Sequence, residues 1–150
     1  MGYTHYWTET KKPKQIPTQA IKIIKEIVEK AYADGIVQYE DNVAKPPVVN
    51  REEIRFNGVA EWGHETFHYG ISDNYKMSDN RYFAFCKTAQ KPYDTVVMKV
   101  LIVLNHYLGD SFKLSSDGFN DKYSEPEWKR TVSQMKKEYG ITFTLEGVND

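Results

Sequence analysis

The chain contains 150 residues, of which 40% are hydrophobic and 27% charged, a composition that fits one globular domain and excludes an intrinsically disordered chain. Its 20 lysines and arginines against 21 aspartates and glutamates give a net charge of -1, which excludes a protein that coats nucleic acid or membranes through bulk charge but leaves a local basic patch open. A single cysteine excludes an internal disulfide, and no apolar run has the length of a signal sequence or a membrane span. We therefore expect a cytoplasmic protein without a membrane partner.

The first half of the chain predicts one helix and three strands. Aromatic and β-branched residues at 2–8 favour a strand. From Thr18 onward, apolar residues recur at spacings of three and four, which predicts an amphipathic helix that is capped by Thr18 and followed by Gly35. Alternating residues at 54–56 and 64–69 then predict two short strands.

The second half of the chain predicts two more helices, separated by short strands. Pro92 begins an apolar segment that continues to Leu108, and a helix that is apolar around its whole circumference is expected to be buried. Ser124 and Glu127 have the spacing of a capping box, which predicts a third helix that ends near Tyr139. The strands expected in this half cover residues 82–87, 111–115 and 141–145.

The order of these elements determines the expected fold class. Short turns between consecutive strands favour an α+β fold with an antiparallel or mixed sheet of about five strands. We expect the apolar helix at the centre of this fold, with two further helices packed beside it. No internal linker divides the sequence, so residues 1–150 are predicted to form a single domain.

The segment from His64 to His68 matches the H-E-x-x-H motif of zinc peptidases. That motif binds zinc where a helix places both histidines on one face. Here the neighbouring Thr, Phe and Tyr residues favour a strand, in which the two histidines would lie about 13 Å apart at ~3.3 Å per residue. We therefore expect polar side chains on a strand rather than a metal site, and no metal or cofactor is predicted.

A segment with lysine and hydroxyl side chains connects the predicted strand at residues 82–87 to the buried helix. Free amides and the positive end of the helix dipole attract anions at such a junction, and Lys87, Thr88 and Lys91 would add further donors. Tyr93 and Asp94 follow in the first turn of the helix. The alternative left open is that Asp94 neutralises the helix start while both lysines are solvated.

Cys86 suggests a nucleophile, because lysines and a helix N-terminus stabilise a thiolate. In an enzyme, His64 or Glu65 would act as the general acid or base, and His106 is a further candidate base. Cysteine is also among the most buried residue types, so we favour a structural role for Cys86 over a catalytic one.

Aromatic residues make up 14% of the chain, an excess that points to a planar ligand. Trp62 and Tyr93 could stack on a base, and Asn57 could pair with a base edge. Ser116 lies in a hydroxyl-rich turn, where it could bond a phosphate or a ribose. For each aromatic residue taken singly, core packing is the commoner role.

Five segments occur in a fixed order along the chain: MGYTHYW from Met1, IRFNG from Ile54, HETF from His64, FCKTAQKPYD from Phe85 and LSSDG from Leu114. Together they resemble a family of small uncharacterised proteins encoded by bacteriophages, prophages and bacteria. The resemblance spans residues 1 to 118 and brings no activity with it. Two positions depart from the family pattern: His68 is commonly another residue, which weakens a zinc site, and Gln90 stands where arginine is expected.

The resemblance implies that polar residues outside the core pattern carry the function. These residues are His5, Asn57, His64, Glu65, Lys87, Thr88, Lys91, Asp94 and Ser116. Small phage proteins with compact pockets include binders that sequester nucleotide signals of host immunity, and this analogy favours an anti-defence role in the host cytoplasm.

The sequence thus predicts a protein that binds and sequesters a small anionic, nucleotide-like ligand. The predicted ligand-binding residues are Asn57, Trp62, His64, Lys87, Thr88, Lys91, Tyr93, Asp94 and Ser116. Two alternatives stay open: an enzyme that acts on a similar ligand through His64, Glu65 or Cys86, and an inhibitor that binds a host protein through its aromatic surface. Bulk nucleic-acid binding is not expected, and a homo-oligomer is compatible with the sequence.

Overall fold

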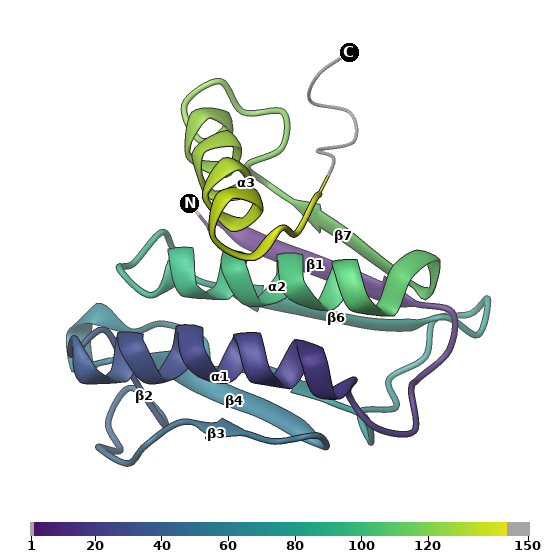
Figure 1. Ribbon diagram of the computed structural model, residues 1–150, viewed down its shortest axis with the longest axis horizontal. Coiled ribbons are helices and arrows are strands. Elements are labelled where there is room, and N and C mark those ends of the chain that lie inside the picture. Colours follow the sequence, from purple (N-terminus) through teal and green to yellow (C-terminus); the bar gives the residue numbers. More distant parts are fainter. Residues whose placement is uncertain (1, 144–150) are drawn as a thin grey trace.

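Two antiparallel sheets lie side by side behind a layer of helices in the computed structural model, which describes residues 2–143 (Figure 1). The helices within this range are α1 (Thr18–Ala33), α2 (Asp94–Leu108) and α3 (Glu125–Tyr139). The strands are β1 (Thr4–Glu9), β2 (Val37–Gln38), β3 (Val48–Val49), β4 (Glu53–Gly58), β5 (Phe67–Gly70), β6 (Tyr82–Lys87) and β7 (Phe112–Ser116). The first sheet has the order β6-β1-β7, and in the second sheet β4 pairs with β2, β3 and β5.

The predicted α+β fold class is confirmed, but the strands do not form one sheet of about five strands. The described residues form a three-stranded sheet and a four-stranded sheet instead. At the seam between them the ring of Trp7 lies 5.3 Å from that of Phe67, and the Tyr69 hydroxyl donates to Glu9 at 2.8 Å. Because these side chains join the two sheets, continuous backbone pairing across the seam is not needed to hold them together.

Helix α2 forms the centre of the core, as its uninterrupted apolar sequence predicts. Leu101, Ile102 and Val103 point to different sides of this helix, and all three are fully buried. Both α1 and α3 pack against α2 (Figure 1). Burial of a side chain of this size stabilises a fold by about 1.5–3 kcal/mol, so α2 contributes a large share of the hydrophobic free energy.

The N-terminal caps of two helices differ from the prediction. Thr18 does not cap α1, because Pro17 occupies the cap position and no side chain bonds the first amides. At α3, Ser124 is the residue before the helix, but its hydroxyl donates to Asp121 at 2.7 Å. The carboxylate of Glu127 accepts from a hydroxyl on α2 instead, so the expected capping box is not formed.

Two strand predictions also need correction. Strand β5 begins at Phe67 rather than at residue 64, because the preceding residues form a loop. Residues 141–143 are not in a strand, and the rest of the predicted edge strand, residues 144 and 145, lies outside the described residues. Among residues 2–143, no helix is long and apolar enough to cross a bilayer.

Candidate functional site

A buried chain of polar side chains connects β1 to the start of α2 and to the end of β7. His5 on β1 is fully buried, and its Nε2 lies 2.6 Å from Asp94 Oδ1. Its Nδ1 lies 2.8 Å from Ser116 Oγ. Because a carboxylate can only accept, Nε2 donates to Asp94, and in the tautomer that carries its hydrogen on Nε2 the Nδ1 atom accepts the hydroxyl hydrogen of Ser116.

Three further donors complete this chain of hydrogen bonds. The buried hydroxyl of Thr88 donates to Asp94 Oδ1 at 2.5 Å. The Oγ of Ser116 accepts the amide N–H of Gly118 at 3.0 Å and the indole N–H of Trp128 at 3.3 Å. We name these side chains the His5 cluster: His5, Thr88, Asp94, Ser116 and Trp128. The His5 cluster ties β1, β7, α2 and α3 together.

The order serine, histidine, aspartate is that of a catalytic triad, but the His5 cluster is closed. The Ser116 hydroxyl already accepts two N–H groups and donates to His5, and Ser116 is only 9% exposed. Each unpaired polar group in such surroundings would cost about 1–3 kcal/mol, and the hydrogen bonds of the cluster avoid this cost. The geometry therefore supports a structural role. The sequence predicted that Ser116 binds the ligand, but its hydroxyl is already bonded within the cluster.

Gly118 is the tightest point beside the His5 cluster. A Cβ atom at this position would collide with the Tyr3 hydroxyl and lie 2.8 Å from Trp128 Nε1. We expect Gly118→Ala to lower the free energy of unfolding by about 1–3 kcal/mol, because overpacking displaces the neighbouring side chains. Urea denaturation measures the loss. The matched control is Gly2→Ala, whose Cβ has open space around it, and equal stability of the two variants would contradict the close packing.

Several amides of the turn before α2, where the anion site was predicted, already donate to backbone carbonyls. The amide of Lys91 donates to the Thr88 carbonyl at 3.0 Å, and the amide of Asp94 donates to the Lys91 carbonyl at 2.8 Å. The Asp94 carboxylate itself occupies the helix start, where it complements the dipole and would repel an anion. Asp94 thus neutralises the start of the helix, as in the alternative that the sequence left open. Thr88 and Asp94 belong to the His5 cluster rather than to a phosphate site.

Asn57 holds a loop rather than a base, contrary to the prediction. Its Oδ1 accepts the amides of Gly58 at 2.6 Å and His64 at 3.0 Å. Its Nδ2 donates to the His64 carbonyl at 2.9 Å and to Thr66 Oγ1 at 3.1 Å. These four bonds use the whole hydrogen-bonding capacity of the amide. Trp62 lies on the loop that Asn57 holds, and its side chain is exposed.

Cys86, Tyr93 and Glu65 meet near the end of β6. The Tyr93 hydroxyl donates to the Glu65 carbonyl at 2.5 Å, and the Cys86 sulfur lies 3.6 Å from the same oxygen. Burial raises the pKa of the Cys86 thiol far above its ordinary value, and the negative charge of Glu65 raises it further. The thiol is therefore held protonated, which opposes the nucleophile hypothesis and agrees with the structural role. Tyr93 is fully buried, so its ring is not free to stack on a ligand.

The two histidines of the H-E-x-x-H segment have different surroundings. His64 lies in the loop before β5, whereas His68 lies on β5 with Nε2 3.1 Å from Glu53 and Nδ1 3.2 Å from Asp73. In the part of the chain from residue 2 to residue 143, no group of three or more His, Cys, Asp or Glu side chains is arranged to hold a metal ion. His68 thus lies between two carboxylates on the outer side of the four-stranded sheet.

The face of the three-stranded sheet that is turned away from the helices carries aromatic rings. Phe85 on β6 and Tyr6 on β1 alternate with more buried neighbours, so they point to the solvent side, and Phe83, two residues before Phe85, lies on the same side. The rings of Phe83 and Phe85 lie 5.8 Å apart, and those of Tyr6 and Phe83 stack at 6.4 Å. Tyr75, from the loop before β6, places its ring 6.4 Å from Phe83. We name these four rings the aromatic face; Phe85 is 45% exposed and Tyr75 68%.

Two exposed lysines flank the aromatic face. Lys87 ends β6, with Nζ 5.8 Å from the centre of the Phe85 ring, and Lys113 lies on β7. Within residues 2–143 neither ammonium group forms an ion pair. Two carboxylates lie near the lysines: that of Asp117 accepts from the Tyr6 hydroxyl at 3.1 Å and from the Thr4 amide at 3.0 Å, and that of Glu65 accepts the backbone amide of Lys87 at 2.9 Å. The lysines are therefore free to meet an anion.

The outer face of the four-stranded sheet has a different character. There Arg55 Nη2 lies 2.7 Å from Glu40 Oε1, and its guanidinium lies 5.0 Å from the centre of the Tyr39 ring. Paired charges of this kind are usual on a sheet face that is exposed to water. The aromatic face is thus an exception within the same molecule, and clustered exposed apolar groups mark interaction surfaces.

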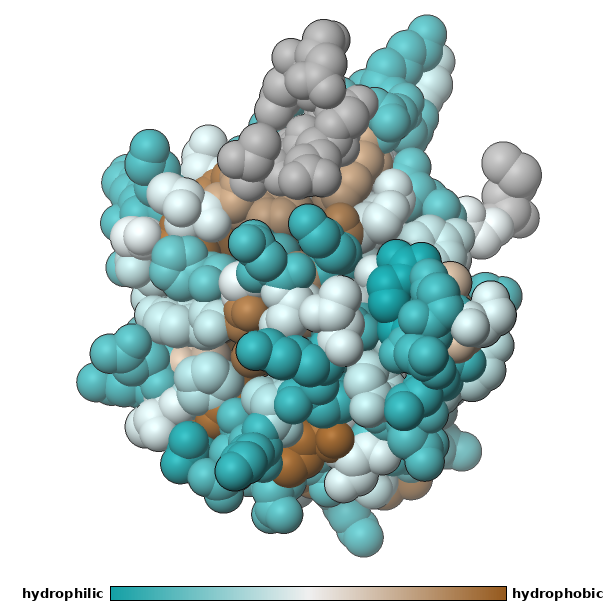
Figure 2. Space-filling model, turned by 90° about the vertical axis from the view of Figure 1, so that its right-hand side faces the viewer, coloured by the Kyte–Doolittle hydropathy of each residue, from teal (hydrophilic) through white to brown (hydrophobic). Residues whose placement is uncertain are grey.

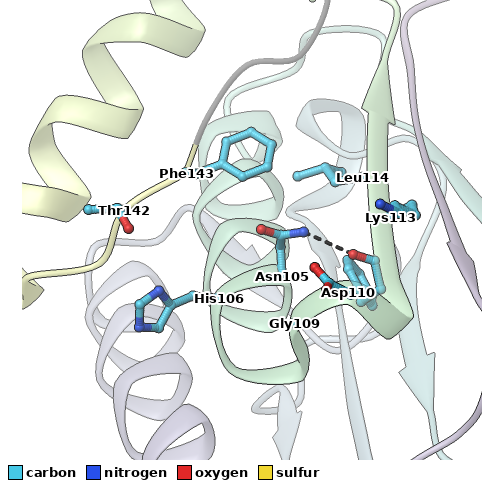
Figure 3. A pocket seen from close by; sticks show the side chains of 9 residues that line it. Asn105, His106, Gly109, Asp110, Lys113, Leu114, Thr142 and Phe143 are labelled. Carbon is cyan, nitrogen blue, oxygen red and sulfur yellow. Dashed lines mark hydrogen bonds between the residues drawn. The ribbon is translucent and has the colours of Figure 1, made fainter.

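Two cavities lie away from the four rings of the aromatic face, although Lys113 lines the first of them. One, of about 340 Å³, opens between the end of α2, β7 and residues 142–143, where Asn105, His106 and Asp110 surround it (Figure 3). The molecule viewed from the side in Figure 2 is mainly hydrophilic, with hydrophobic atoms gathered next to the part drawn in grey. The other cavity, of about 380 Å³, lies between α1 and the segment around Pro46. No residue predicted to bind the ligand lines either cavity.

The aromatic face was not predicted from the sequence, although a signal for it exists there. Phe83 and Phe85 alternate with Ala84 and Cys86 in a predicted strand. A sheet that is covered on one side turns every second residue to solvent, so a buried Cys86 places both phenylalanines on the open side.

The candidate site is therefore the aromatic face with Lys87 and Lys113. No family model, curated protein or solved structure matches the chain.

Proposed function

We propose that the protein binds a nucleotide-like ligand, with its base stacked on the aromatic face and its phosphate held by Lys87. The observation that carries this proposal is the group of exposed and partly exposed rings beside two lysines that form no ion pair with any residue from 2 to 143. Stacking of a base on an aromatic side chain contributes about 1–3 kcal/mol and tolerates any base, because every base has a π face. Lys87 keeps the role expected from the sequence, whereas the base contacts move from Asn57 and Tyr93 to the aromatic face.

Sequestration without chemical change is the simplest use of such a site. His5 and Cys86, which have the chemistry for catalysis, are both fully buried. The hydroxyl groups of Thr8 and Ser115 lie on the same side of the sheet as the rings and can bond a ribose or a phosphate. Together with the resemblance to a phage-encoded family, this arrangement supports capture of a nucleotide signal of the host.

Phe85→Ala is expected to weaken the binding of adenosine monophosphate by roughly tenfold, because it removes a stacking platform worth about 1–3 kcal/mol. Lys87→Ala is expected to weaken binding of adenosine monophosphate while leaving that of uncharged adenosine unchanged. Isothermal titration calorimetry measures both ligands. Tyr123→Ala is the matched control, because Tyr123 is a highly exposed aromatic residue outside the aromatic face. Unchanged affinity of Phe85→Ala for both ligands would refute the proposed site.

Binding of a protein partner is the second candidate function. The same exposed rings favour it, since aromatic residues are enriched in protein interfaces. This alternative predicts no calorimetric response to adenosine or adenosine monophosphate, and an association with a protein that Phe85→Ala weakens.

A further inference from the structure

The rings of the aromatic face lie in two successive rows across the sheet. The backbone register aligns Phe85 with Tyr6 in one row and Phe83 with Thr8 in the next. Rows of side chains on one face of a strand repeat every two residues, which is about 6.6 Å. The sheet therefore presents stacking surfaces at two separate levels rather than one.

The aromatic face is open rather than concave. The cavity of about 340 Å³ reaches the candidate site only at Lys113, and the cavity of about 380 Å³ lies elsewhere. The hollow bordered by Phe83 and Tyr75 measures only about 10 Å³. Sites for small molecules usually bury most of the ligand surface in a cavity. An open face instead suits a ligand that gains contact area through its length.

The two lysines are too far apart to hold a single phosphate. Lys87 aligns with Thr4, whereas Lys113 aligns with Thr8, so the lysines differ by four residues along β1 and lie on strands at opposite sides of it. With ~3.3 Å per residue and ~4.8 Å between strands, their backbones lie about 16 Å apart. A mononucleotide carries its phosphate at one end and reaches only one of these lysines, whereas linked nucleotides can reach both.

Resting on the proposed function, we propose that the ligand is a single-stranded oligonucleotide that crosses the sheet from Lys87 on β6 to Lys113 on β7. Its phosphates contact the two lysines, and its bases stack on Phe85, Tyr6 and Phe83. A duplex does not fit this arrangement, because paired bases do not present their faces to aromatic rings. Only two lysines contact phosphates in this arrangement, so the protein binds a short stretch of the strand. This agrees with the net charge of -1, which does not favour binding through bulk charge.

Fluorescence anisotropy with labelled oligothymidylates and oligouridylates tests this proposal, with lengths from one to about eight nucleotides. Affinity is expected to rise with length until the ligand spans both lysines. The logarithm of the binding constant is expected to fall with the logarithm of salt concentration with a slope of about -1.4, since each phosphate contact to a single strand contributes about -0.7. Lys87→Ala and Lys113→Ala should each bring the slope to about -0.7. Lys22→Ala, an exposed lysine on α1, is the matched control and should leave it unchanged.

The outcomes separate this inference from the proposed function. Mononucleotides that bind as tightly as the longer ligands, through Phe85, would overturn the oligonucleotide proposal and leave the proposed function intact. Absence of binding at every length would overturn both. Equal affinity for duplex and single strand would overturn the stacked arrangement. Sedimentation in which Phe85→Ala converts a dimer to a monomer, without nucleotide binding, would identify the face as a protein interface. The comparison of thymidylate with uridylate shows whether DNA or RNA is the preferred form.

Discussion

Above about pH 10 the protein is expected to unfold cooperatively instead of releasing the protons of its buried tyrosines one by one. The Tyr69 hydroxyl donates to the buried carboxylate of Glu9 at 2.8 Å, and burial, followed by the Glu9 charge, raises the pKa of Tyr69 far above its ordinary 10.0. Burial is also the main cause that raises the pKa of Tyr93 and of Cys86. The folded protein therefore retains three protons that the unfolded chain releases at high pH.

The sign of the effect follows from these raised pKa values. Below the ordinary pKa values of 9.0 for the thiol and 10.0 for the tyrosines, both states keep the protons and stability is full. As the pH rises further, the unfolded chain binds fewer protons, so the free energy of unfolding falls. Each group lowers it by about 1.4 kcal/mol per pH unit, ~4 kcal/mol for the three, against a total of about 5–15 kcal/mol for a domain. Tyr3, whose pKa burial raises to about 12, adds to the loss.

Circular dichroism and tyrosinate absorbance measured together against pH test this prediction. The part of the tyrosinate signal that comes from the buried tyrosines should change in the same narrow range of pH as the circular dichroism, because these tyrosines ionise only on unfolding. Tyr93→Phe removes one of the retained protons and should make the decline of stability with pH shallower, whereas Tyr123→Phe, at an exposed position, should leave it unchanged. Gradual ionisation of all 11 tyrosines with unchanged circular dichroism would show that the rings are not buried as described.

Asp94→Ala is expected to lower the free energy of unfolding by about 2–5 kcal/mol, the largest loss expected from a single polar substitution in this protein. The Asp94 carboxylate accepts hydrogen bonds from His5 at 2.6 Å and from Thr88 at 2.5 Å, and both donors are fully buried. Its removal leaves two buried donors without this acceptor. Urea denaturation followed by tryptophan fluorescence measures the change, since Trp128 belongs to the same cluster.

Asp94→Asn separates the hydrogen bonds from the charge. The amide oxygen occupies the position of Oδ1 and still accepts from both donors, so this variant should lose less stability than Asp94→Ala. Both variants that remain folded should bind adenosine monophosphate like the unchanged protein, because Asp94 is not part of the aromatic face. If Asp94→Ala were as stable as the unchanged protein, the structural role would be contradicted. If Asp94→Asn folded but did not bind adenosine monophosphate, Asp94 would be a ligand-binding residue, as the sequence predicted.

The helix caps show why some local predictions failed. A capping box between Ser124 and Glu127 is a sequence pattern, but the Ser124 hydroxyl donates to Asp121 and Glu127 accepts from Thr95 on α2. A partner that lies 32 positions away cannot be recognised from a spacing of three. By contrast, the helix after Pro92 ends at Leu108 as predicted, because its boundary depends on local residues such as Gly109.

The amino-acid sequence by itself determined the order of the main helices and strands, the α+β class and the burial of α2. These properties depend on the spacing of apolar residues within one segment, and that spacing can be read along the chain. Only the tertiary structure decided which polar residues became internal. His5 meets Ser116 across 111 positions and Asp94 across 89, so folding alone pairs them. The packing of distant helices likewise decided that β6 is covered on the Cys86 side. Phe83 and Phe85 therefore lie on the open side of the sheet, where Phe83 is partly buried and Phe85 is exposed.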